Sequence, residues 1–99
     1  MCGIVAYVGP RDAQPILLDA LSRLEYRGYD SAGLAIFNGK GVEVRKKSGR
    51  IQELASACQK KPVQGRIGIS HTRWATHGGA TDINAHPHLD ATGRLALVH

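Results

Sequence analysis

The first nine residues, MCGIVAYVG, place a cysteine directly before an apolar run that lies between Gly3 and Gly9. A short apolar run bounded by glycines predicts a buried β-strand. The ends of most domains are poorly ordered unless such an element ties them down. A strand from Gly3 to Gly9 therefore anchors the N-terminus in a sheet and fixes Cys2 at one end of it.

Two amphipathic helices are predicted further along the chain. The first covers residues 12–27, because leucines recur at helical spacing between Asp12, a suitable N-cap, and Gly28, a natural stop. The second covers residues 52–60 and places Cys58 on its apolar face, where a free cysteine is most simply a small core residue.

The remaining pattern predicts strands and one long loop. Residues 34–37 and 42–45 flank an Asn-Gly turn and predict a hairpin. Residues 66–72 alternate apolar with small or polar side chains, and residues 94–99 begin another strand. Residues 73–88 have no period and predict a long ordered loop, which is usually a functional one. The pattern alone gives an α+β fold class.

Composition limits the function classes. The chain has 99 residues, enough for one small domain, and a formal net charge of +5. A basic chain invites a nucleic-acid interpretation, but only 5% of its residues are aromatic, which argues against a base-stacking platform. The densest basic run, Arg45, Lys46, Lys47 and Arg50, is interpreted as a solvated basic edge, with a polyanion site as the alternative. We expect neither a nucleic-acid nor a membrane partner.

Two cysteines do not make a disulfide framework, and the sequence shows neither a signal peptide nor an apolar run long enough to span a membrane. We therefore expect a cytoplasmic protein. The five histidines lack a common zinc spacing, and neither cysteine completes a C-x-x-C pair. We expect no metal and no cofactor.

Cys2 becomes a distinctive nucleophile if Met1 is removed. It then carries a thiol and a free α-amine, whose pKa of about 7.7–8.0 suits a general base near neutral pH. An N-terminal nucleophile of this kind supplies its own base. The alternative is that Cys2 is an incidental residue near a frayed terminus.

Two polar stretches accompany it. LEYRGYDSAG, residues 24–33, follows the first predicted helix, and SHTRWATHGG, residues 70–79, opens the long loop. In the second stretch, the planar fork of Arg73 suits a carboxylate, Trp74 can shield a pocket, and two glycines let the loop close as a lid. The simpler alternatives are a helix cap with a polar turn and a surface loop with one buried tryptophan.

Together with CGIVAYVG and NAHPH, these stretches resemble the glutaminase domain of the glutamine–fructose-6-phosphate aminotransferases. That domain belongs to the class II glutamine amidotransferases, which are N-terminal nucleophile (Ntn) hydrolases. YRGYDSAG and HTRWATHG favour this sugar-aminating branch over the phosphoribosylpyrophosphate amidotransferases. The resemblance implies an αββα four-layer sandwich with largely antiparallel sheets, of which residues 1–99 are the N-terminal portion.

The resemblance also implies roles for single residues. Cys2 is expected to attack the side-chain amide of glutamine, and Arg27 to support the N-terminal strand. The glutamine-binding residues are expected to be Arg73, Trp74, Thr76, His77 and His86. The released ammonia would convert fructose 6-phosphate to glucosamine 6-phosphate in a region beyond residue 99, within a homo-oligomeric parent.

In that family an Asn-Gly oxyanion hole and the acid that binds the glutamine amine lie beyond the position of His99. We therefore expect the 99 residues by themselves to be inactive. The alternatives are a truncated module that binds glutamine without turnover, the glutaminase domain of another class II amidotransferase, and a basic nucleic-acid adaptor.

Overall fold

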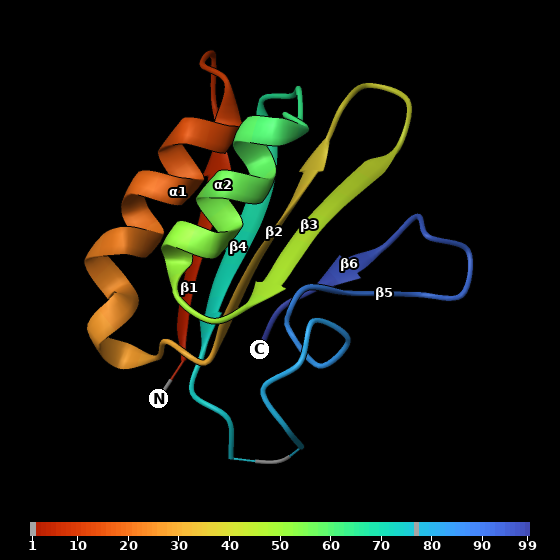
Figure 1. Cartoon of the computed structure of the whole chain (residues 1–99). Coiled ribbons are helices and arrows are strands. Elements are labelled where there is room, and N and C mark those ends of the chain that lie inside the picture. Colours follow the sequence, from red (N-terminus) through yellow and green to blue (C-terminus); the bar gives the residue numbers. More distant parts are fainter. Residues whose placement is uncertain (1, 77) are drawn as a thin grey trace.

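The computed structural model describes residues 2–76 and 78–99. Its centre is a four-stranded antiparallel sheet in the order β1-β4-β2-β3 (Figure 1). The strands are β1 (Gly3–Val8), β2 (Ser31–Phe37), β3 (Val42–Ser48) and β4 (Ile67–Arg73). The N-terminal strand therefore pairs with β4, which follows it by about sixty residues, and β4 also pairs with β2. This arrangement carries the start of the chain to the end of β4.

Two helices cover one face of the sheet, side by side (Figure 1). They are α1 (Ala13–Leu24), which continues into the short 3-10 helix η1 (Glu25–Arg27), and α2 (Ile51–Lys60). The core lies between these helices and the sheet, where Leu17, Leu21 and Leu54 meet Leu34 and Ile36 of β2. Cys58 is fully buried in the same core, as the sequence predicts, and burial raises the pKa of its thiol.

The chain after β4 lies over part of the other face. It forms turns and then a small hairpin of β5 (His88–Leu89) and β6 (Ala96–Leu97), which projects beside the main sheet (Figure 1). This hairpin leaves Leu95 and Leu97 largely exposed. Only two of the six residues expected to begin a strand at 94–99 are in one.

The predicted elements are found, with shifted ends. The hairpin strands extend beyond the prediction to Ser31 and Ser48, and the turn between them is held by Asn38, whose Oδ1 accepts the backbone N–H groups of Lys40 and Gly41. The prediction of a buried first strand was wrong in one respect. Side chains alternate along a strand, so only every second residue of β1 faces the helices, and Val8, on the other face of this edge strand, is 77% exposed.

The basic run at 45–50 is not a uniformly solvated edge. The Lys46 ammonium donates to backbone carbonyl groups of the loop after β4. The Arg45, Lys47 and Arg50 side chains lie near Glu43, Asp82 and Glu25, respectively. Each of these cations thus has a partner within the chain. Among the described residues, no helix combines the length and apolarity needed to cross a membrane.

Candidate functional site

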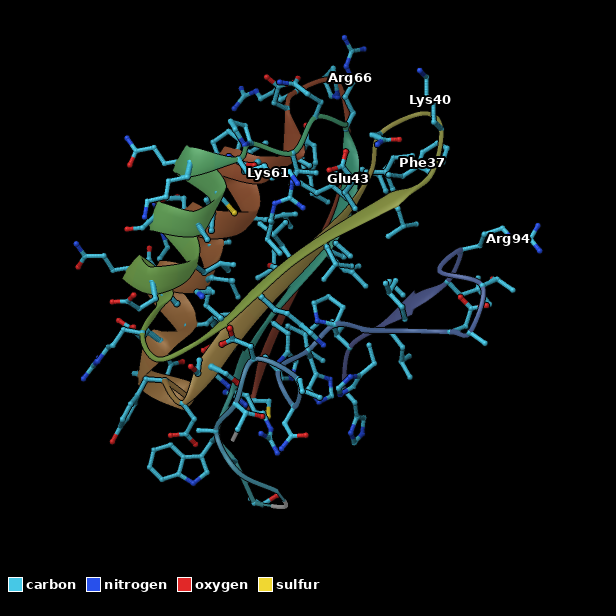
Figure 2. The ribbon with its side chains drawn as sticks, turned by 45° about the vertical axis from the view of Figure 1, so that its right-hand side comes forward. Phe37, Lys40, Glu43, Lys61, Arg66 and Arg94 are labelled. Carbon is cyan, nitrogen blue, oxygen red and sulfur yellow. The ribbon has the colours of Figure 1, made fainter. Side chains whose placement is uncertain are left out.

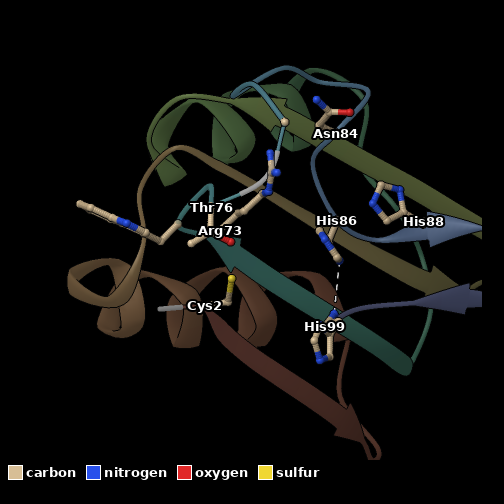
Figure 3. A pocket seen from close by; sticks show the side chains of 9 residues that line it. Cys2, Arg73, Thr76, Asn84, His86, His88 and His99 are labelled. Atoms are coloured by element: carbon tan, nitrogen blue, oxygen red, sulfur yellow. Dashed lines mark hydrogen bonds between the residues drawn. The ribbon is translucent and has the colours of Figure 1, made fainter.

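A pocket of about 740 Å³ opens where the N-terminus, the end of β4 and the loop after it meet (Figure 3). We call it the N-terminal pocket. It lies at the opposite end of the sheet from the β2–β3 turn, where Lys40 projects (Figure 2). Its walls come from four separate parts of the sequence: Cys2, Arg73, Trp74, Thr76, Gly78, Asn84, His86, His88 and His99.

Cys2 reaches the pocket because it directly precedes the edge strand β1. The pairing of Gly3 with Thr72 sets the position of β1 beside β4. The Nε of Arg27 donates to the Cys2 carbonyl oxygen at 3.2 Å, which holds the residue from the other side. In Figure 3 the Cys2 thiol points into the pocket, toward Arg73 and Thr76. The structure thus gives Arg27 a contact with the backbone of Cys2.

Gly28 lets the first polar stretch lie directly against the end of β4. A Cβ on Gly28 would lie 2.6 Å from the backbone carbon of Arg73 and 2.7 Å from the backbone nitrogen of Trp74. The Thr72 hydroxyl donates to the Gly28 carbonyl oxygen. The φ of Gly28 is −179°, which any residue adopts, so the position requires glycine for space. Gly28 is also the helix stop that the sequence predicts, because η1 ends at Arg27 and the Gly28 N–H donates to the Glu25 carbonyl oxygen.

Asp30 holds the first residues of the loop. Its Oδ2 accepts the backbone N–H of Ala75 at 2.5 Å, and its own N–H donates to the Arg73 carbonyl oxygen at 3.0 Å. Its carbonyl oxygen accepts the N–H of Gly49 at 2.7 Å. One residue thus links β4, the loop and the turn before α2. This fixes the backbone beside Thr76, which lines the pocket.

Trp74 contacts Tyr29 of the first polar stretch, residues 24–33. Its ring meets the Tyr29 ring edge-on, with centroids 5.3 Å apart and planes at 84°. The Arg50 guanidinium lies over the other ring of this pair, 4.6 Å from the Tyr29 centroid, and also within 3.5 Å of a Glu25 carboxylate oxygen. Trp74 remains 43% exposed, so the expected pocket shield lies at the rim of the pocket.

Arg73 lines the pocket and is only 8% exposed. Its Nη1 donates to the Gly79 carbonyl oxygen at 2.9 Å, and the same oxygen accepts the Asn84 amide at 3.0 Å. The loop thus folds back so that Asn84 and Arg73 share one acceptor. A buried guanidinium at the wall of an open pocket suits a carboxylate ligand.

Four histidines form the remaining wall and its support. The His86 ring stacks on the fully buried His71 ring with centroids 4.2 Å apart, and the centroids of the His86 and His88 rings are 4.4 Å apart. His86 Nδ1 accepts the backbone N–H of His99 at 3.2 Å, and His71 Nε2 donates to the His99 carbonyl oxygen at 2.8 Å. Burial, with the nearby His71, lowers the pKa of His86 to about 4, and burial also lowers that of His71. Both rings are therefore neutral at pH 7.

The N-terminal pocket brings together five of the seven predicted site residues: Cys2, Arg73, Trp74, Thr76 and His86. Arg27 lies behind Cys2 and contacts its backbone. The seventh, His77, lies outside the described residues, as does Met1. The catalytic and binding roles of these residues stay predictions. Among the described residues, no cluster of three or more His, Cys, Asp or Glu side chains is suited to hold a metal ion.

Sequence reasoning missed Asp30 as a support and Asn84, His88 and His99 as wall residues. Asp30 was within a stretch already singled out, and a carboxylate beside a glycine-rich turn is a signal for backbone capture. Asn84 and His88 flank His86 in NAHPH, and the shared motif was their available signal.

Known proteins resemble this chain over its whole length, although no family model matches it. Curated relatives match over all 99 residues: glutamine–fructose-6-phosphate aminotransferase (isomerizing) from Thermus thermophilus is 61% identical, and that from Aquifex aeolicus is 58% identical. The chain spans 16% and 17%, respectively, of the length of these relatives.

Solved structures share the fold. The glutamine phosphoribosylpyrophosphate amidotransferase from B. subtilis, complexed with ADP and GMP, matches 91% of this chain with a TM-score of 0.76 and 27% identity. A structure described as the allosteric regulatory enzyme of purine biosynthesis matches 90% with a TM-score of 0.78 and 29% identity. The chain covers 19% of each. These findings confirm the resemblance drawn from the motifs: the chain has the α+β fold of the Ntn glutamine amidotransferases and is similar over its whole length to the N-terminal region of the glutamine–fructose-6-phosphate aminotransferases.

Proposed function

We propose that this chain hydrolyses the side-chain amide of glutamine with Cys2 as an N-terminal nucleophile. It would do so as the N-terminal portion of a glutamine amidotransferase domain. The observation that carries the proposal is the N-terminal pocket, in which Cys2 shares walls with Arg73 and Thr76. The identity of more than half to the aminotransferases, against 27–29% to the purine enzymes, supports the sugar-aminating branch.

The reaction begins once Met1 is removed and Cys2 carries a free α-amine. The amine accepts the thiol proton as Sγ attacks the amide carbon, which forms a C–S bond. The same proton then goes to the departing nitrogen, the C–N bond breaks, and ammonia leaves behind a γ-glutamyl thioester. Water attacks the thioester, which gives glutamate and restores the thiol. Arg27, bonded to the Cys2 carbonyl oxygen, holds the attacking residue in place.

Glutamine binding is assigned to the wall opposite Cys2. The buried Arg73 guanidinium would pair with the α-carboxylate, and Thr76 and His86 would add polar contacts. His77 is retained as a predicted contact from the motif. Because the His86 ring is neutral at pH 7 and its Nδ1 accepts the His99 N–H, its Nε2–H can donate one hydrogen bond without adding charge near the reacting amide. Trp74 at the rim would limit the entry of water.

The wider role follows from the relatives. We propose that the ammonia serves the conversion of fructose 6-phosphate to glucosamine 6-phosphate in a homo-oligomeric protein of which this chain is the N-terminal part. We also propose a cytoplasmic location, where the free thiols of Cys2 and Cys58 stay reduced.

The test is glutamate release from glutamine by the full-length gene product. Cys2→Ala should abolish release, and Cys2→Ser should leave little. Protein that retains Met1, quantified by mass spectrometry, should be nearly as inactive as Cys2→Ala because its amine is acylated. Cys58→Ala is the matched control for Cys2→Ala, since that thiol is buried in the core and does not line the pocket. Full activity with Met1 retained would refute the N-terminal base.

A further inference from the structure

One segment of the pocket wall, residues 83–87, is held in place by two residues of the β2–β3 hairpin. Residues 83–87, in the turns between β4 and β5, carry Asn84 and His86 into the N-terminal pocket. The segment lies on the face of the sheet opposite the helices, over the β2–β3 hairpin. The two hairpin residues beneath it are Gly33 and Lys46, which are directly opposite in the antiparallel register.

Lys46 binds the segment by its backbone. Its Nζ donates to the carbonyl oxygens of Ile83 at 3.2 Å, Ala85 at 3.0 Å and Pro87 at 3.3 Å. An ammonium group has three donors, and all three are used. The residue is half-buried, and burial lowers the pKa of its ammonium group, while nearby Asp82 opposes that shift. This cation is partly removed from solvent, and it binds three alternate carbonyl groups of the segment.

Gly33 provides the space that Lys46 requires. A Cβ on Gly33 would lie 2.0 Å from the His86 carbonyl oxygen and 2.8 Å from the Lys46 Cβ. The first contact is with backbone, which cannot turn aside as a long side chain can. A side chain at position 33 would therefore lift the segment from the sheet.

The position of this segment also reaches Arg73. The Asn84 amide donates to the Gly79 carbonyl oxygen, and the Arg73 guanidinium donates to the same atom. Displacement of Asn84 would therefore remove one of the two donors that fix Gly79. The Gly79 carbonyl oxygen, which accepts a hydrogen bond from the Arg73 guanidinium, would then be placed less firmly.

We propose that Gly33 and Lys46 are positioning residues of the N-terminal pocket, which set the places of Asn84 and His86 and, through Gly79, the direction of the Arg73 guanidinium. They act on the binding of a ligand that carries an α-carboxylate and do not touch the reacting atoms. The inference rests on the proposed function for the identity of that ligand as glutamine.

The test compares Lys46→Met with Lys40→Met in the full-length gene product. Methionine keeps the length of the side chain and removes its donors, and Lys40 is an exposed lysine at the far tip of the same hairpin (Figure 2). Lys46→Met should raise the KM for glutamine about tenfold, the scale of one lost charge-assisted hydrogen bond. The rate of Cys2 alkylation by iodoacetamide, which needs no carboxylate site, should stay within about twofold. Lys40→Met should change neither.

Two further measurements complete the design. Gly33→Ala should raise the KM in the same way with Lys46 intact, whereas Gly41→Ala, where a Cβ meets no atom within 4 Å, should not. Amide hydrogen exchange over residues 78–88 should rise in Lys46→Met and stay unchanged across β1–β4. This readout needs no activity, so it separates failure of the support from failure of the proposed function.

The outcomes are distinct. Wild-type protein without glutaminase activity, but with the expected exchange difference, would overturn the proposed function and leave the support standing. If the protein is active and Lys46→Met keeps a wild-type KM for glutamine, the inference is overturned. It is also overturned if the alkylation rate of Cys2 falls by the same factor as the KM rises. If Lys46→Met does not fold, Lys46→Arg replaces it, since arginine keeps the charge in a different shape. A raised KM with an unchanged alkylation rate would then support the inference, and an unchanged KM would overturn it.

Discussion

The hydrogen bond from Ala75 to Asp30 predicts a measurable loss of glutamine affinity when the carboxylate is removed. The bond joins Asp30 Oδ2 to the Ala75 nitrogen at 2.5 Å and holds the backbone next to Thr76. A hydrogen bond to a charged group contributes about 1.5–3 kcal/mol. Because Asp30 is only half-buried, the lower end applies, and about 1.4 kcal/mol corresponds to tenfold in an equilibrium constant. Asp30→Ala should therefore raise the KM for glutamine about tenfold.

Asp30→Asn separates charge from geometry. Its amide oxygen can still accept the Ala75 N–H, but without charge assistance, so the KM should rise only about threefold. The assay is steady-state glutamate release by the full-length gene product, with iodoacetamide alkylation of Cys2 as the measure of thiol access. Asp19→Ala is the control, since among the described residues that exposed carboxylate pairs with the exposed Arg23 on α1, away from the pocket walls. An Asp30→Ala protein that binds glutamine as well as Asp19→Ala does would refute the role of Asp30.

Three other outcomes are expected. Gly28→Ala should lower the free energy of unfolding by about 1–3 kcal/mol in urea denaturation, because its Cβ meets backbone at 2.6 Å, whereas Gly41→Ala should be nearly neutral. The free energy of unfolding should fall as the pH is lowered from 6.5 toward 4. In this range His86 binds a proton in the unfolded chain but not in the folded one, where burial holds its pKa at about 4. His86→Phe should therefore make the dependence of the unfolding free energy on pH less steep. Iodoacetamide should label Cys2 much faster than Cys58 in folded protein, and urea should remove the difference, as mass spectrometry of peptides would report.

Local periodicity was sufficient to find the helices and the main strands. Leucines at helical spacing define α1, and the Asn-Gly pair defines the β2–β3 turn. Neither signal says which strands pair. The contact of β1 with β4 is made across about sixty residues, so no local pattern reveals that β1 is an edge strand with Val8 exposed. The ends of the strands were misplaced for the same reason, because pairing partners decide where a strand stops.

The site could be predicted in part because its residues lie in short motifs. Cys2, Arg73 and Thr76 have side-chain chemistry that suggests a site, and the structure brings them to one pocket. Lys46 gave the opposite signal, since it sits in a basic run typical of a solvated surface. Only the fold shows that its side chain turns inward to three carbonyl oxygens of a segment almost forty residues away.

The stretch at residues 24–33 supports the pocket from behind, and this explains its mixture of residue types. Arg27 holds the carbonyl group of Cys2, Gly28 lies against the backbone of Arg73, and Asp30 holds the N–H of Ala75. All three act on backbone, and none lines the pocket itself. Arg27 and Asp30 reach a backbone group with a charged side chain, whereas Gly28 has no side chain and so allows two backbones to touch. The stretch therefore links the backbone of Cys2 to the backbone at the end of β4 and the start of the loop after it.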